Sequence, residues 1–174
     1  MTENLSRAER LSAELEASFR NRADLYRLLL DELTASLGTI EAEALLVRAI
    51  EKRGREVAAA FQEFAPRQAR EIGEAFLAVS PDGGRMYPTD VERRPDGISF
   101  RVLRCPLKDA WRGAGVADAK LETLCRIAGA FDRGLFEATG VCFANRTWQV
   151  GDGDHCCEIH LTNAASSADA DDPA

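Results

Sequence analysis

Long apolar runs are missing from this chain, and its first ten residues lack the apolar core of a secretory signal. The longest apolar stretches are far too short to cross a bilayer, so a membrane-spanning protein is not expected. An excess of positive charge is missing too, because the formal net charge is -7 and Lys and Arg are interleaved with Asp and Glu. No nucleic-acid partner is therefore expected. The sequence predicts a cytoplasmic protein that acts on a small molecule or contacts another protein.

Several common functional signatures are absent as well. The chain has no glycine-rich phosphate loop, no serine nucleophile elbow and no closely spaced C-x-x-C pair. A phosphate-binding loop, a serine hydrolase and a paired-cysteine zinc site are therefore not predicted by motif. The stretch Gly151-Asp152-Gly153-Asp154 lacks the terminal Glu of a calcium loop and is interpreted as a turn.

What the chain does contain is typical of one globular domain. It has 174 residues, of which 45% are hydrophobic and 29% are charged, enough to bury a core without disulfides. We predict a single domain over residues 1–162 and a flexible tail over residues 163–174, which is rich in Ala, Ser and Asp. The five cysteines are predicted to be thiols, because the cytosol keeps cysteine reduced.

The first half of the chain is predicted to be helical. Apolar residues recur every three or four positions from residue 5 to 36, as one long helix or two. Gly38 is a plausible stop, and Thr39 opens a second helical stretch. Pro66 is expected to end or bend that stretch, after which residues 68–79 resume helical spacing.

The second half mixes strands and helices. Residues 86–93 and 98–103 are predicted to form one hairpin, and residues 141–150 and 155–161 a second. Between them, Pro106 opens a short helix and Asp118 caps a longer one over residues 119–139. The predicted fold class is therefore α+β, with the helical N-terminal half packed on a small antiparallel sheet of two hairpins.

Cys105 is the leading candidate for chemistry. It lies where a strand meets a helix that Pro106 opens, and the partial positive charge of a helix N-terminus stabilises a thiolate. Asp109, one turn on, could face the same side. Cys125 and Asp132 are seven residues apart and share one face of the longer helix. The alternative interpretation is a packed cysteine and a solvated aspartate.

The last strand holds a second cluster of polar residues. Strict alternation would put Cys156, Glu158 and His160 on one face and His155, Cys157, Ile159 and Leu161 on the inner face. No cofactor is predicted, but zinc stays open as an alternative, with Cys105, Cys125, Cys157 and a histidine as candidate ligands. Trp111 and Trp148 could line a ligand pocket, and Cys142 is expected to be packed in its strand.

Three groups of residues resemble the L-2-amino-thiazoline-4-carboxylic acid hydrolase family. They are Arg104-Cys105-Pro106-Leu107, Leu124-Cys125 with Asp132, and Arg146-Thr147 leading to Gly153-Asp154-His155-Cys156-Cys157. The resemblance implies hydrolytic opening of a C–N bond in a small cyclic amidine or thiazoline. It also implies that Cys105, Cys125, Asp132 and Cys157 belong to one pocket.

A mechanism follows as a hypothesis. Cys105 attacks the amidine-like carbon or orients water, while Asp132, His155 or His160 transfers protons, and Asp109, Trp111 and Arg146 contact substrate. Two alternatives remain open: a non-catalytic ligand- or metal-binding sensor, because the pattern also resembles the 4-vinyl-reductase-type domain, and a scaffold that forms a homo-oligomer through its long helices.

Overall fold

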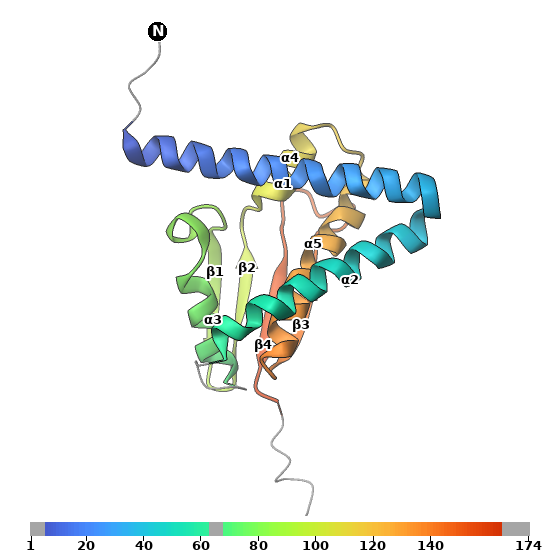
Figure 1. The fold of residues 1–174 in the computed structure, drawn as a ribbon. Helices are drawn as coiled ribbons and strands as arrows, with labels where there is room; N and C mark the ends of the chain where they lie inside the picture. The colour runs from blue at the N-terminus through green and yellow to red at the C-terminus, as the bar shows by residue number, and fades with distance from the viewer. Residues whose placement is uncertain (1–5, 63–67, 165–174) are drawn as a thin grey trace, which may run out of the picture.

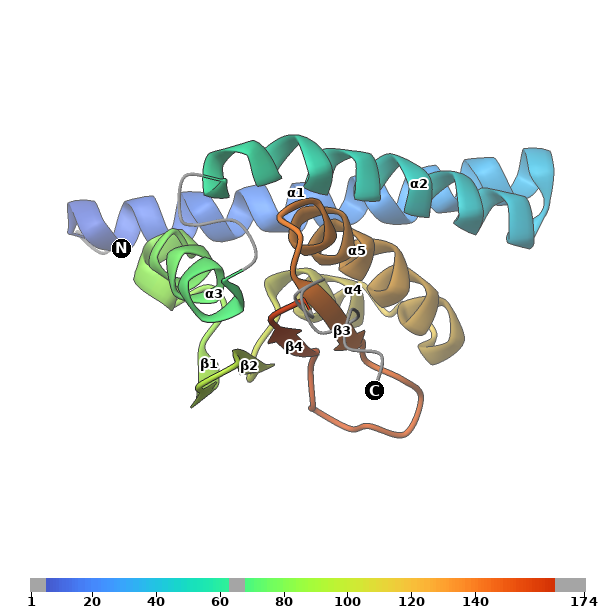
Figure 2. The ribbon, with the colours of Figure 1, turned by 90° about the horizontal axis from the view of Figure 1, so that it is seen from below.

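The computed structural model describes residues 6–62 and 68–164. They form two layers, with helices packed on one face of a four-stranded antiparallel sheet (Figures 1 and 2). The predicted α+β class is confirmed.

The N-terminal half is a helical hairpin. Helix α1 spans Arg7–Leu37 and begins with a capping box, in which the Ser6 side chain accepts from the Glu9 backbone and the Glu9 carboxylate accepts from the Ser6 backbone. Gly38 follows with a φ of 83°, a conformation open to glycine, and helix α2 starts at once over Thr39–Ala58. The predicted break at Gly38 is therefore confirmed.

Helix α3 (Ala69–Ala78) follows the prediction for residues 68–79, whereas Pro66 lies outside the described residues. Short 3-10 turns, η1 (Ala59–Phe61) and η2 (Pro81–Gly84), come before and after α3. In Figure 1, α3 lies beside β1 at one edge of the sheet.

The sheet joins two antiparallel pairs. Its strands are β1 (Thr89–Arg94), β2 (Gly97–Val102), β3 (Cys142–Arg146) and β4 (Glu158–Thr162), in the order β1-β2-β4-β3. Ile98 pairs with Leu161 at the centre, and both side chains are fully buried under the helices. Strands β1, β3 and β4 are shorter than predicted, because residues 86–88, 147–150 and 155–157 are not part of them, whereas β2 has the predicted length.

Two helices lie between the hairpins. Helix α4 (Pro106–Gly113) starts at Pro106 as predicted, with Cys105 at its N-cap position. Helix α5 (Asp118–Ala138) is capped by Ala117 instead of Asp118, which is the first helical residue. Asp118 there complements the helix dipole without a capping hydrogen bond.

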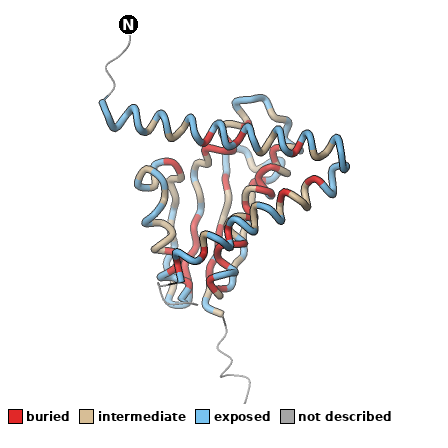
Figure 3. Tube along the Cα trace, viewed as in Figure 1, coloured by how far each residue is buried: buried red, intermediate tan, exposed pale blue. Residues whose placement is uncertain are grey.

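The core consists of two hydrophobic clusters. One joins α1, α2, α4 and α5 around Phe19, Leu46 and Trp111. The other joins α3, α5 and the sheet around Ile72, Phe100 and Phe136. Figure 3 shows the buried segments where the helices face the sheet and the exposed segments along the outside of α1.

The C-terminal end of the fold lies slightly beyond the expected boundary. Asn163, expected in the tail, accepts a hydrogen bond from the Ala69 backbone N–H at 2.9 Å and donates its own N–H to the Asp96 carbonyl. The rest of the predicted tail beyond residue 164 lies outside the described residues. No helix in the described ranges has the length and hydropathy to traverse a bilayer.

Candidate functional site

A cavity of about 330 Å³ lies between the two hydrophobic clusters. Helices α1 and α5, strand β2 and the segment 147–157 all contribute to its wall. The lining is mostly apolar and aromatic, including Phe19, Phe61, Phe76, Tyr87, Phe100, Trp111, Phe131 and Trp148. Its polar groups are few, and the four thiols of Cys105, Cys125, Cys156 and Cys157 are among them.

Asp132 places a carboxyl group in this apolar wall. Its accessible surface faces the cavity, so the side chain is half-buried by area while protein encloses it. Burial raises the pKa of Asp132 to about 7, and Arg22 opposes this shift. Within the described ranges, no hydrogen bond or ion pair joins the Asp132 carboxyl to another protein group. The carboxyl is therefore available to a molecule in the cavity.

Arg22 lies at the edge of the cavity, on the exposed side of α1. Its guanidinium is 5.9 Å from the Phe19 ring centroid and 5.8 Å from the Tyr26 ring centroid, within cation–π range. It is also the cation that acts on Asp132. Arg22 is thus a positively charged group at the boundary between the cavity and solvent.

Cys105 lines the cavity at the start of α4, as the sequence indicated. Its ionisation differs from the prediction. The backbone N–H groups of Leu107 and Lys108 favour the thiolate, but burial is the larger effect and raises the pKa of Cys105 to about 11. The expected stabilisation of a thiolate by the helix N-terminus is therefore outweighed by loss of solvation.

Cys125 and Cys157 are also held in the neutral form. Burial raises the pKa of Cys125 to about 12, and burial followed by the neighbouring Cys105 raises the pKa of Cys157 well above its usual value. Cys156 is 3% exposed and lines the same cavity. Residues 155–157 precede β4, so the predicted alternation does not apply to them. Cys156 and Cys157 both reach the cavity as a result.

The segment 147–157, which carries Trp148, Cys156 and Cys157, is fastened to α4. Lys108 is 3% exposed, and its ammonium donates to the carbonyls of Asp154 and His155 at 2.9 and 2.6 Å. Arg112 pairs with the Asp154 carboxylate, donates to the Gly153 carbonyl and lies over the Trp148 ring. These contacts fix the wall that the segment forms.

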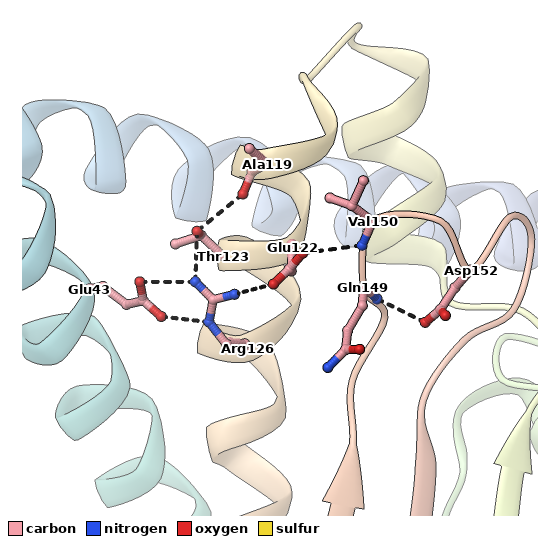
Figure 4. A network of polar contacts seen from close by, with 8 residues as sticks. All are labelled: Glu43, Ala119, Glu122, Thr123, Arg126, Gln149, Val150 and Asp152. Atoms are coloured by element: carbon pink, nitrogen blue, oxygen red, sulfur yellow. Dashed lines mark hydrogen bonds and ion pairs between the residues drawn. The ribbon is translucent and has the colours of Figure 1, made fainter.

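A second attachment joins the same segment to α5 and α2 (Figure 4). The Glu122 carboxylate accepts from the Val150 backbone N–H at 3.1 Å and from Arg126. Arg126 also pairs with Glu43 of α2 and donates to the Thr123 hydroxyl. The ion pair between Arg126 and Glu122 therefore also anchors the segment.

The structure brings together Cys105, Cys125, Asp132, Cys157 and Trp111, because all five line the cavity. The Trp111 indole N–H donates to the Ala23 carbonyl, so its ring is the part that contacts the cavity. The other four predicted site residues are not among the cavity-lining side chains: Asp109, Arg146, His155 and His160.

Each of these four residues has another position. Asp109 is exposed and pairs with Arg104, and Arg146 pairs with Asp152. The His155 side chain is exposed, and the His160 ring bonds Ser99 on the open face of the sheet. Cys142, expected to be packed, is exposed on the edge strand β3.

Sequence reasoning missed Arg22, Tyr87 and Lys108, which also line the cavity. Burial raises the pKa of Tyr87, and its ring packs edge-on against Phe19 at 5.5 Å between centroids. No local pattern marks these residues, because their place depends on how α1 and α4 cross the sheet.

Metal ligation was the alternative for the thiols. Among the residues that the structure describes, no group of three or more His, Cys, Asp or Glu side chains is arranged to hold a metal ion. The zinc ligands named from the sequence thus remain a prediction for metal analysis.

Comparisons with known proteins give two findings. A family model described as L-2-amino-thiazoline-4-carboxylic acid hydrolase matches residues 18–161. The phenol-responsive sensory domain of the transcription activator PoxR, crystallised with phenol, has a similar fold, with a TM-score of 0.51 at 20% identity. That likeness covers 80% of this chain and 73% of the other. No curated protein sequence matches this chain.

Proposed function

We propose, given that this chain belongs to the L-2-amino-thiazoline-4-carboxylic acid hydrolase family, that it binds a small ring compound in its apolar cavity. In this proposal the ligand donates a hydrogen bond to Asp132. The observation that carries it is that, among the described residues, the Asp132 carboxyl forms no hydrogen bond or ion pair in a mostly apolar wall. The family expected from the Cys105, Cys125 and Cys157 motifs is confirmed by the match over residues 18–161.

The size and lining of the cavity support a small flat ligand. A volume of about 330 Å³ is at the lower end of ligand pockets, which bind through apolar surface and a few placed polar groups. Phe19, Tyr87 and Trp148 offer ring faces and edges to such a ligand. A larger or strongly charged molecule would leave its polar groups without partners in this wall.

The state of the thiols favours binding over thiol catalysis. A nucleophilic cysteine needs a thiolate or an adjacent base. Here burial raises the pKa values of Cys105 and Cys125 to about 11 and 12, and the side chains that line the cavity in the described ranges include no histidine. The neighbour of similar fold is a phenol-responsive sensory domain, which supports a sensor function for this chain.

Binding can be tested with phenol, aniline and 2-amino-thiazoline-4-carboxylate as probes. Both tryptophans line the cavity, so their fluorescence reports its occupancy. We expect saturable quenching by at least one probe, and Asp132→Asn weakens that binding about tenfold, the effect of one charged hydrogen bond.

Asp109→Asn is the matched control, because Asp109 is exposed outside the cavity, where it pairs with Arg104. It should bind as the wild type does. Absence of saturable binding by all three probes, or equal loss in both variants, would refute the proposal.

A second candidate is hydrolysis, which the family description and one observation favour. A carboxyl with a pKa of about 7 can take and return a proton at neutral pH. In this scheme Asp132 accepts a proton from water as the oxygen adds to the amidine carbon. The bond from that carbon to the ring nitrogen then breaks, and Asp132 gives the proton to this nitrogen. In the same scheme, Cys105 orients the water molecule before it attacks.

Turnover separates the two candidates. The hydrolase predicts release of a ring-opened product from 2-amino-thiazoline-4-carboxylate, with activity lost in Asp132→Asn and kept in Asp109→Asn. If the probe binds but mass spectrometry detects no product after long incubation, the hydrolase candidate is ruled out and the sensor function remains.

A further inference from the structure

Helix α1 carries an exposed stripe that the fold of one chain does not use. The core side of α1 buries Phe19, Ala23 and Leu30. About a third of a turn away lies a row of six exposed residues, spaced alternately four and three apart. We call this row the α1 stripe: Ser18, Arg22, Leu25, Leu29, Glu32 and Ser36. Figures 1 and 3 show α1 on the outside of the molecule.

The spacing of the α1 stripe is that of a helix that pairs with another helix. Alternate steps of four and three keep residues on one seam, as in coiled coils. At its centre, Leu25 is 52% and Leu29 is 50% exposed. Two adjacent leucines that are half open to solvent on one face form an apolar patch suited to burial.

We propose that the α1 stripe is the contact surface between two copies of this chain, whose α1 helices pair antiparallel about a two-fold axis. With the axis level with residue 27, Leu25 meets Leu29 of the partner subunit. Arg22 then meets Glu32 of the partner subunit, and Ser18 meets Ser36 of the partner subunit. The stripe is therefore self-complementary, as an isologous interface requires.

Charge selects the antiparallel arrangement. The other arginines along this part of α1 are used within the chain, because Arg20 pairs with Glu16 and Arg27 pairs with Asp24 and Asp31. Arg22 lies over the Phe19 and Tyr26 rings and lowers the pKa of Asp132, but neither Arg22 nor Glu32 forms an ion pair within residues 6–62 and 68–164. A parallel pair would oppose Arg22 to its own copy and Glu32 to its own copy, which is repulsive.

The ends of the α1 stripe permit close approach. The Ser18 hydroxyl donates to the Glu14 carbonyl at 3.0 Å, and the Ser36 hydroxyl donates to the Glu32 carbonyl at 2.9 Å. Their polarity is thus satisfied inside the helix, and they present small side chains to the partner. The paired segment, residues 18–36, is about 28 Å long, so the contact is modest and the dimer is expected to depend on concentration.

Sedimentation equilibrium of the full chain over a wide concentration range tests the proposal. We expect a monomer–dimer equilibrium for the wild type. Leu25→Asp should raise the dimer dissociation constant by at least about tenfold, since a carboxylate is buried twice. Leu11→Asp is the matched control: Leu11 is 55% exposed on the same helix but outside the paired segment, and its variant should dimerise normally.

Charge reversal identifies the partners. Arg22→Glu and Glu32→Arg should each dimerise poorly alone, whereas an equimolar mixture should form a heterodimer in which both charge pairs are attractive. Circular dichroism checks that each variant keeps its helices. A wild type that is monomeric throughout, a dimer that survives Leu25→Asp, or no gain on mixing would each overturn the proposal.

Discussion

At the scale of the residue, Asp132 sets the character of the cavity. A carboxyl among aromatic rings loses solvation, so its neutral form is favoured and its pKa rises to about 7. When ionised, Asp132 destabilises the native state. The same carboxylate can accept a hydrogen bond from a ligand in the cavity. A function for the cavity explains why an ionisable group occupies such a position.

The cost of ionising the buried Asp132 carboxyl predicts that the free energy of unfolding depends on pH. Burial raises the native pKa of Asp132 above its ordinary value of 3.8, so the unfolded state releases this proton first as pH rises. Stability contributed by protonated Asp132 is therefore present below about pH 4 and is lost as pH rises through about 7. The full shift corresponds to about 4 kcal/mol, which screening through the mouth of the cavity reduces to about 2 kcal/mol.

Urea unfolding of the wild type and Asp132→Asn at pH 5 and pH 8 measures this effect. Because Asn cannot ionise, the variant should gain stability relative to the wild type at the higher pH. A difference between the two proteins that is the same at both pH values would contradict the buried-carboxyl interpretation.

The five thiols provide a second prediction at this scale. Burial keeps Cys105, Cys125 and Cys157 protonated at neutral pH, whereas Cys142 is exposed. Mass-resolved alkylation with iodoacetamide should therefore label Cys142 first and the cavity thiols only after unfolding. Rapid selective labelling of Cys105 would instead favour the hydrolase, and zinc that protects the thiols and is released by acid would support the metal site.

At the scale of the element, the close approach of α2 and α5 supports the cavity wall. A Cβ atom added at Gly134 would lie 2.0 Å from the Glu51 carbonyl oxygen, and one added at Gly54 would lie 2.1 Å from the Phe131 carbonyl oxygen. Both carbonyl oxygens are backbone atoms of the facing helix, so α2 and α5 pack backbone against backbone at these two glycines. Residues 125–132 of α5 depend on this contact for their position.

Gly134→Ala is therefore expected to lower the free energy of unfolding by about 3 kcal/mol, because the helices must separate. Gly113→Ala is the control: no atom lies within 4 Å of its added Cβ, and it should be neutral or slightly stabilising. Thermal and urea unfolding compare the two variants. Equal stability would show that α2 and α5 are less tightly packed than described.

The elements also show how far the sequence predicts this molecule. The ends of α1 and the start of α4 were predictable, because Gly38 and Pro106 act through local backbone geometry. The start of β4 was not, because it depends on contacts that are distant in the sequence: β4 pairs with β2 from Glu158 on, and Lys108 binds the His155 carbonyl. Cys105, Cys125 and Cys157 line the cavity with Asp132 and the two histidines do not, since only the fold decides which side chains reach the cavity.

At the scale of the whole molecule, the cavity lies between two hydrophobic cores. Phe19 and Trp111 belong to one core, Phe100 and Leu135 to the other, and all four line the cavity. A cavity at this place lowers stability, because its walls lose packing contacts. A ligand that fills it would join the cores, and its binding free energy would add to the stability of the native state.

Filling the space with a side chain should therefore replace the ligand. Ala128 lines the cavity from the interior of α5, so Ala128→Leu is expected to raise the free energy of unfolding by about 1 kcal/mol and to weaken probe binding at least about tenfold. Ala119→Leu, exposed on the same helix, is the control and should change neither quantity. Urea unfolding and tryptophan quenching on the same samples measure both. A variant that is stabilised yet binds the probe as the wild type does would place the ligand site outside this cavity.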